Sequence, residues 1–248
     1  MKIMLLLFSF SIAICTAYGQ SGNLSVNHKE IAAVTNQKTG PVYKDTASIT
    51  NGQLMELKEQ FGRNKTYAPE YEKLVLPALS FFPELKDYRV TFKVRKHGAP
   101  LSTRPAYGTM FRHARKRTYM VFISSDTSTQ WKVIQLNRVP VMAQLGIIGH
   151  ELSHIIEFRD KNTFGLIGLG INHVSNSYMN KFEFQADSIC IAHGLGDYLL
   201  VWSTHAREAF GAPDPEQLGV KGEMSNYSER YMSPATIRRY MEEMEKLK

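Results

Sequence analysis

Two histidines and a glutamate stand together in the stretch GIIGHELSHIIEFRD, which covers residues 146–160. His150 and His154 are four residues apart, so on a helix both imidazoles leave the same face one turn apart. Glu151 lies beside them, where its carboxylate can reach a metal-bound water rather than the metal. Zinc accepts two nitrogens and one carboxylate, and it makes a bound water acidic enough for a nearby carboxylate to deprotonate. The spacing therefore predicts a zinc site with Glu151 as the general base.

Such a site needs a third protein ligand, and the sequence offers two carboxylates. Asp160 lies six residues after His154, but reaching the metal from there requires a sharp turn with glycine three residues after that histidine. The chain has Glu157 at that position, and a helix continuing through it would carry Asp160 away. We prefer Glu183, in KFEFQAD on a later predicted helix. Asp187 is four residues further on the same face, where it can hydrogen-bond the far nitrogen of a ligating histidine.

The segments GHELSHIIEF and EFQAD together resemble the gluzincin metallopeptidases over about forty residues. The resemblance is closest to the branch that contains the CAAX prenyl proteases, the heat-shock membrane proteases and their soluble periplasmic relatives. It implies one zinc ion per chain, bound by His150, His154 and Glu183. It also implies that Glu151 is the catalytic base and that Asp187 supports a histidine, His150 in the first place.

The C-terminal part of the chain departs from that branch. The branch often carries a Thr/Ser-His-Pro stretch followed by an arginine, whereas YMSPATIRR has Ser233 where the histidine would fall, which leaves Arg238 as a weak counterpart. A zinc peptidase also needs a donor for the oxyanion that develops in the transition state. His205, Tyr227 and Tyr231 are candidates, and their spacing selects none of them.

A small sheet followed by helices is expected to position these residues. The segments 88–96 and 117–125 alternate apolar and polar residues, which predicts two half-buried strands, with loops and a short strand between them. The apolar, glycine-rich segment 164–172 is expected to form a loop or a buried or membrane-touching lip. Strands before helices favour an α+β fold, here a zincin-like single domain. We hypothesise that 117–125 is an edge strand that pairs with extended substrate. Helices are predicted at 51–62, 68–82, 138–158, 175–194, 196–211 and 233–248.

The N-terminal residues 1–19 have the pattern of a secretory signal peptide, with Lys2 before an apolar run and small residues before the cleavage site. An anchor helix and a lipoprotein signal at Cys15 are the alternatives. Cleavage would lower the net charge from +7 to +6 and leave Cys190 as a single buried thiol. Residues 20–50 are expected to form a polar leader and 51–248 the metallopeptidase domain, exported to the periplasm or secreted.

The densest basic cluster is RHARKR, residues 112–117. Its cations, Arg112, Arg115, Lys116 and Arg117, could contact an anionic membrane, an envelope polymer or an acidic substrate. A solvated hairpin tip is the interpretation we prefer. Nucleic acid is a poor partner for an exported chain whose basic residues are not interleaved with aromatic ones.

The sequence as a whole predicts an exported zinc metallopeptidase that acts on peptides or proteins. Two alternatives stay open. The first is a zinc hydrolase that acts on a non-peptide amide of the cell envelope. The second is a non-catalytic, chaperone-like protein that keeps zinc for stability, although a structural zinc site has no use for a base such as Glu151.

Overall fold

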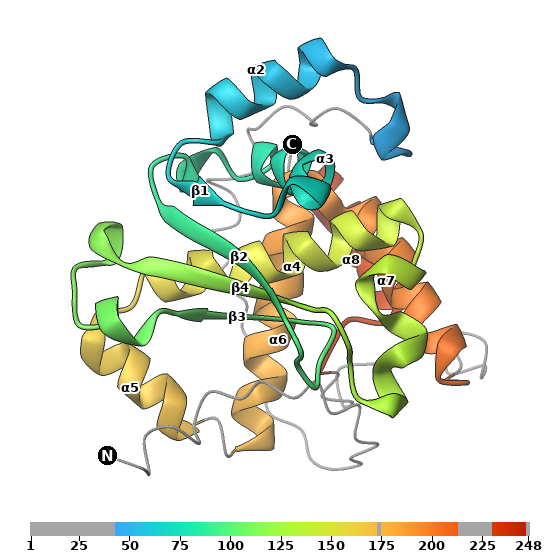
Figure 1. Ribbon diagram of the computed structural model, residues 1–248. Coiled ribbons are helices and arrows are strands. Elements are labelled where there is room, and N and C mark those ends of the chain that lie inside the picture. The colour runs from blue at the N-terminus through green and yellow to red at the C-terminus, as the bar shows by residue number, and fades with distance from the viewer. Residues whose placement is uncertain (1–42, 173–174, 213–229, 247–248) are drawn as a thin grey trace.

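The computed structural model describes residues 43–172, 175–212 and 230–246 and has an α+β fold (Figure 1). Its four-stranded sheet has the order β1-β2-β4-β3. The first three strands in that order run parallel, and β3 is antiparallel to β4. The predicted signal peptide and most of the predicted leader lie outside the described residues. The strands are β1 (Lys65–Thr66), β2 (Arg89–Arg95), β3 (Leu101–Pro105) and β4 (Thr118–Ser124).

The helices follow the predicted pattern except at one segment. The segment 164–172, expected as a loop or lip, is the helix α5, so its three glycines do not prevent helix formation. Between α6 and α7 a π turn, Ile191–Leu195, contains Gly194 at φ 85°, a conformation that favours glycine. In the described residues no helix is both long and apolar enough to cross a membrane. The helices are α2 (Asn51–Phe61), α3 (Glu72–Ser80), α4 (Val141–Arg159), α5 (Thr163–Asn172), α6 (Asn176–Cys190), α7 (Gly196–Ala209) and α8 (Pro234–Lys246).

The strand predicted at 117–125 is β4, and it lies inside the sheet between β2 and β3. The hypothesis that it is an edge strand is therefore wrong, because both of its sides are already paired. Alternation of apolar residues reports that one face is buried, but it does not report how many neighbours a strand has. The edge strand on this side is β3, in the region where only a short strand was expected.

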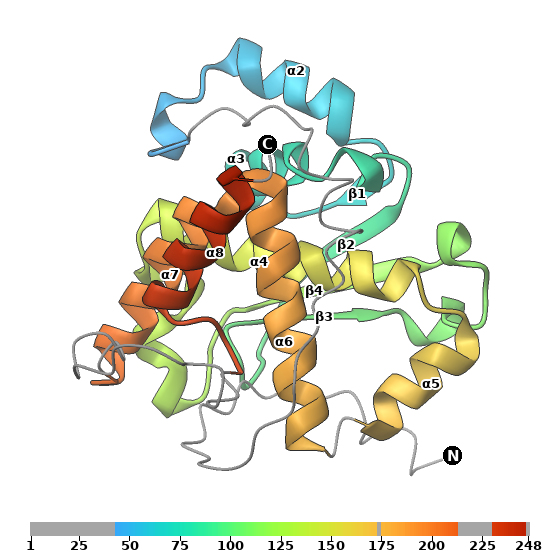
Figure 2. The same ribbon diagram turned by 180° about the vertical axis from the view of Figure 1, so that it is seen from behind.

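The helix α4 carries the two histidines and is buried around nearly its whole circumference. It packs against β3 on one side and against α3, α6 and α7 on others, so the layers are sheet, α4 and outer helices (Figure 2). Two glycines allow this close packing. A Cβ at Gly146 would clash with the backbone carbonyl of Tyr198 on α7, and one at Gly149 would come within 2.6 Å of Leu195 Cδ1.

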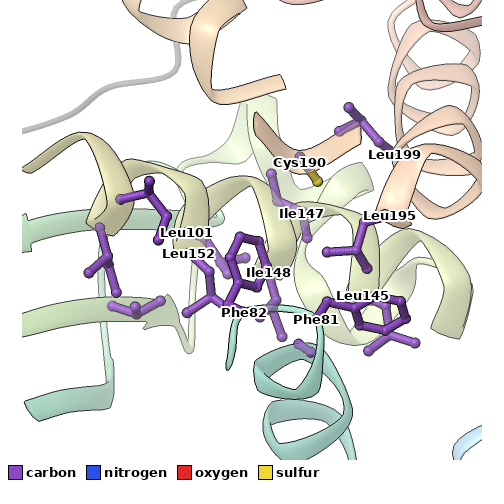
Figure 3. Close-up of a cluster of buried hydrophobic side chains, with 14 of the residues drawn as sticks. Phe81, Phe82, Leu101, Leu145, Ile147, Ile148, Leu152, Cys190, Leu195 and Leu199 are labelled. Atoms are coloured by element: carbon purple, nitrogen blue, oxygen red, sulfur yellow. The ribbon is translucent and has the colours of Figure 1, made fainter. Parts of the chain in front are cut away.

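Apolar side chains from distant segments fix the position of α4 in the core. Figure 3 shows Ile147, Ile148 and Leu152 of α4 in one cluster with residues from the end of α3, from β3 and from the start of α7. Cys190 is part of this cluster as a free, fully buried thiol, as predicted. Burial raises the pKa of this thiol well above its ordinary value, which keeps it protonated and unreactive.

Arg117 is a fully buried cation at the C-terminal end of α4. Its Nη1 donates to the carbonyls of Phe158 at 3.2 Å and Lys161 at 2.7 Å, and its Nε donates to the carbonyl of Arg112 at 2.8 Å. The last carbonyls of a helix lack partners within the helix and carry partial negative charge, so a cation stabilises them. The prediction that Arg117 belongs to a surface-contacting basic cluster is therefore wrong, whereas Arg112, Arg115 and Lys116 are exposed.

Candidate metal centre

Three side chains from two helices converge on one buried point. His150 and His154 come from α4 and Glu183 from α6, and one ligand atom of each lies within 4.8 Å of the others. Glu183 Oε2 is 3.2 Å from His150 Nε2 and 3.3 Å from His154 Nε2. All three residues are buried. This group could hold a metal ion.

The amphipathic pattern of α6 explains why Glu183 reaches the histidines. The buried residues of α6 recur every three to four positions, so they form one face, and this face packs on α4. Glu183 and Asp187 belong to it. Phe182, also on this face, stacks on the His154 ring with centroids 4.7 Å apart and an interplanar angle of 15°. The ring of the second histidine is therefore fixed by packing as well as by hydrogen bonds.

Each histidine has a carboxylate on the nitrogen that faces away from the convergence point. Asp187 Oδ1 is 2.7 Å from His150 Nδ1, and Glu157 Oε2 is 3.0 Å from His154 Nδ1. A carboxylate only accepts hydrogen bonds, so each Nδ1 carries a proton, and each Nε2, which faces Glu183 Oε2, is the atom that can coordinate a metal once it has lost its own proton. The structure thus brings Asp187 to the histidine to which the gluzincin resemblance assigns it.

Glu157 is a site residue that the sequence analysis missed. It was noted only as the residue that stands where a turning glycine would be needed. The available signal was its spacing, because a residue three positions after a histidine lies next to it on a helix. Asp160, the rejected ligand candidate, lies at the exposed end of α4 and accepts a hydrogen bond from Arg159 Nε at 3.2 Å.

The electrostatics of the cluster favour positive charge at its centre. Burial by itself would lower the pKa of His150, but hydrogen bonds with Asp187 and Glu183 outweigh it and raise this pKa well above 6.5. Burial likewise opposes charge on His154, yet the nearby Glu183 and Glu157 raise its pKa to about 9. The pKa of Glu183 falls far below its ordinary value, because the two histidines outweigh the effect of burial. The carboxylates that favour the protonated forms of His150 and His154 would also attract a divalent cation between these groups.

Glu151 is buried next to this cluster, and its Oε2 has no hydrogen-bond partner among the described residues. Thr103 of β3 lies beside this carboxylate, and the contact with its hydroxyl lowers the pKa of Glu151, although no hydrogen bond of good geometry joins the two. Burial raises the pKa of Glu151, against the lowering effect of His154 and His150. Buried oxygens normally have partners, so a carboxylate oxygen that has none among the described residues, and that lies beside a metal-binding group, is available to bond to a water or a substrate there.

Of the three oxyanion-donor candidates, the structure brings Tyr231 to the site. Its ring centroid is 5.8 Å from that of His150. Burial first, and the charge of Glu183 next, raise the pKa of the phenol well above 10, so the hydroxyl keeps its proton and remains a donor. His205 lies on α7, where no contact with the cluster is observed, and Tyr227 lies outside the described residues.

The segment after Tyr231 is tied to the metal-binding group. The backbone N–H of Met232 donates to Asp187 Oδ2 at 2.8 Å, so Asp187 bonds to His150 and to this segment at once. Ser233, which stands where the related branch has histidine, accepts a hydrogen bond from the N–H of Thr236 and caps α8. Arg238 lies on the exposed side of α8.

No protein-family model matches this chain, and searches among curated proteins and solved structures find no match either.

Proposed function

We propose that the chain is an exported zinc metallopeptidase that hydrolyses peptide bonds in peptides or proteins. The observation that carries the proposal is the pairing of two features within five residues of α4. His150 and His154 direct their Nε2 atoms to Glu183, and the intervening Glu151 keeps a buried carboxylate oxygen that has no partner in the part of the chain that the structure describes.

The donor set fits zinc in a catalytic rather than a structural site. Zinc favours imidazole nitrogen and carboxylate oxygen in tetrahedral arrangements. Structural zinc sites use four protein ligands, whereas catalytic sites use three and leave a position for water. The described residues offer three ligands here. The carboxylates on both Nδ1 atoms support the ligand tautomer that such a site requires.

Glu151 and Tyr231 have different roles in the proposed reaction: Glu151 transfers a proton, and Tyr231 stabilises the oxyanion. When bound, zinc would polarise the scissile carbonyl and lower the pKa of the attacking water. Glu151 takes the proton from the attacking water and passes it to the leaving amine, and its raised pKa suits a group that must both accept and release a proton near neutral pH. The Tyr231 hydroxyl donates to the developing oxyanion. Tyr231→Phe should lower kcat by about 100- to 1000-fold while zinc content stays at the wild-type level.

The edge strand β3 takes over the substrate-pairing role that was first assigned to β4. Ala106 N donates to Thr118 O, and Ser124 N donates to Pro100 O. In an antiparallel ladder every second residue bonds to the neighbouring strand, and these two bonds show that Pro100 and Ala106 belong to that set. The backbone groups of Leu101 and Thr103, which belong to the other set, therefore point away from β4. Leu101 and Thr103 are buried, so an extended substrate that pairs there must displace what covers this edge, and it would then run past Thr103, the neighbour of Glu151. Thr103→Pro removes one of these N–H groups and should reduce turnover without loss of zinc; full turnover would contradict this pairing.

Export is proposed from residues 1–19, and it is tested separately from the chemistry. The first residue of the form that a cell exports is expected to be Gln20 within a few positions. N-terminal sequencing of that form gives the answer, and an unprocessed chain that stays in the cell would contradict export.

The test of the chemistry compares wild type with Glu151→Gln on casein, with zinc content measured in both. The proposal predicts equal zinc and loss of cleavage in the variant, because glutamine cannot accept the proton. Equal cleavage by both proteins would refute it. Zinc in wild type without cleavage of any peptide would also refute it, in favour of a non-peptide amide substrate or a non-catalytic zinc protein.

A further inference from the structure

The exposed apolar side chains of this protein gather in one region. Seven large apolar side chains are exposed in the described residues, and five of them lie on α5 or on the connection between β3 and β4. On α5, Phe164 is 82% exposed, Ile171 60% and Ile167 39%. On the connection, Phe111 is 62% exposed and Tyr107 37%. We call these five residues the apolar patch.

The fold gives α5 one buried face, and no element of residues 43–172, 175–212 or 230–246 covers the other. Leu166, Leu169 and Gly170 are buried, whereas Phe164, Ile167 and Ile171 recur at intervals of three and four residues and so share the opposite face. The helix contains no charged residue. A surface helix normally presents polar side chains to water, so an apolar outer face indicates a further partner.

The two parts of the apolar patch are held next to each other. Arg117, at the end of the connection, donates to the carbonyls of Phe158 and Lys161, and Lys161 lies two residues before the first residue of α5. Both views of the ribbon place the connection beside the start of α5 (Figures 1 and 2). The buried arginine therefore fixes the geometry of this surface.

Exposed cations flank the apolar patch. Arg112 follows Phe111 directly, Arg115 and Lys116 follow after His113 and Ala114, and all three cations are exposed. The nearest carboxylate in the sequence before α5 is Asp160, which is engaged by Arg159. Apolar side chains beside a group of cations match the two layers of an anionic lipid surface, with acyl chains below and phosphate groups above.

We propose that this protein binds the surface of an anionic phospholipid bilayer, with the apolar patch inserted and Arg112, Arg115 and Lys116 at the headgroups. The binding is peripheral, because the inserted helix lies in the surface and is only ten residues long. It is independent of the proposed peptidase activity. It orients the C-terminal end of α4 toward the lipid surface.

Vesicle flotation tests the proposal. It uses the protein as it is purified from the expressing cell, whether or not residues 1–19 have been removed. Vesicles contain either phosphatidylcholine alone or equal amounts of phosphatidylcholine and phosphatidylglycerol. Wild type should float with the anionic vesicles, much less with the neutral ones, and less at high salt. Each cation near such a surface strengthens binding roughly fivefold, so glutamine at Arg112, Arg115 and Lys116 together should weaken it on the order of 100-fold.

Matched controls separate this surface from general charge and general hydrophobicity. Phe164→Ser with Ile171→Ser should abolish flotation, whereas Met55→Ser should not, although Met55 is 72% exposed on α2 at the other end of the molecule. All of these side chains are exposed, so thermal unfolding should stay at the wild-type midpoint. The control for charge replaces three exposed cations outside the region by glutamine: Arg63, Lys86 and Arg239.

A positional readout excludes binding through another part of the chain. Relative to wild type, whose own tryptophans are Trp131 and Trp202, Phe164→Trp should add fluorescence that bromine-labelled acyl chains in anionic vesicles quench, and Met55→Trp should add fluorescence that they do not quench. Equal quenching at both positions, unchanged flotation of the serine or glutamine variants, or no flotation of wild type would overturn the proposal. Loss of a solution dimer in the Phe164→Ser, Ile171→Ser variant without any vesicle binding would assign the apolar patch to a second copy of the chain instead.

Discussion

Asp187 accepts hydrogen bonds from two donors, and this makes Asp187→Asn a sharp test of the metal centre. Oδ1 bonds to His150 Nδ1 at 2.7 Å and Oδ2 bonds to the N–H of Met232 at 2.8 Å. Asparagine keeps one oxygen and replaces the other with an NH₂ donor. If the oxygen stays on Met232, the NH₂ faces His150 and favours the tautomer whose proton is on Nε2, the atom directed at the metal.

The two orientations of the asparagine side chain have different measurable costs. With the NH₂ on His150, metal affinity should fall by about 10- to 100-fold, which is about 1.4 to 2.8 kcal/mol. With the NH₂ on Met232, two donors face each other in a buried position, and the free energy of unfolding should fall by about 1 to 3 kcal/mol. At least one of these losses is unavoidable.

Glu157→Gln is the matched control. Glu157 bonds to His154 Nδ1 through one oxygen at 3.0 Å, and glutamine can present its single oxygen there. Its metal affinity should stay closer to wild type than that of Asp187→Asn. Competition with a chromophoric chelator measures the affinity, and unfolding in denaturant, with and without zinc, measures stability. Wild-type affinity and stability in Asp187→Asn, or equal affinity losses in the two variants, would refute this reasoning.

Further predictions follow from the same geometry. Glu183→Ala should lose zinc, and Asp160→Ala should keep one ion per chain by metal analysis. The reverse result would assign the third ligand to Asp160 in place of Glu183. Arg117→Ala should lower the free energy of unfolding in denaturant by about 3 kcal/mol, because buried carbonyls lose a charged donor, whereas Arg115→Ala should change it little. The interaction of protonated His154 with Glu183 and Glu157 stabilises the metal-free protein below pH 6.5. This contribution is lost as the pH rises through the His154 pKa of about 9. Zinc displaces the Nε2 protons of both histidines, so calorimetry near pH 7.5 in buffers of different ionisation enthalpy should show release of between about one and two protons per zinc ion; binding without proton release would contradict the assignment.

The site could be predicted from the sequence where helical spacing alone decides which side chains meet. His150 and His154 share a face because they are four residues apart, and the same spacing relates Glu183 to Asp187. Tyr231 could be named only as one of three candidates, because its approach depends on the path of the chain before α8. Glu157 could have been predicted, because a residue three positions after His154 lies next to it on a helix. The sequence analysis treats it only as the residue that prevents a sharp turn toward Asp160.

The fold could be predicted in outline, and the errors have physical causes. The segment 117–125 was recognised as a strand, but the number of its neighbours depends on pairing with β3, which periodicity does not report. The segment 164–172 forms a helix because burial of Leu166 and Leu169 outweighs the low helix propensity of its glycines. Arg117 is buried among exposed cations because the end of α4 lies beside it, a contact between residues far apart in the sequence.

A zinc titration of chelator-treated protein tests the central claim most directly, with peptide cleavage as the readout. Activity should be absent without zinc, rise in proportion to added zinc and reach its plateau at one ion per chain in wild type. Glu151→Gln should bind the same single ion and stay inactive at every ratio. Cleavage by the zinc-free protein, or cleavage by zinc-loaded Glu151→Gln at the wild-type rate, would contradict the account.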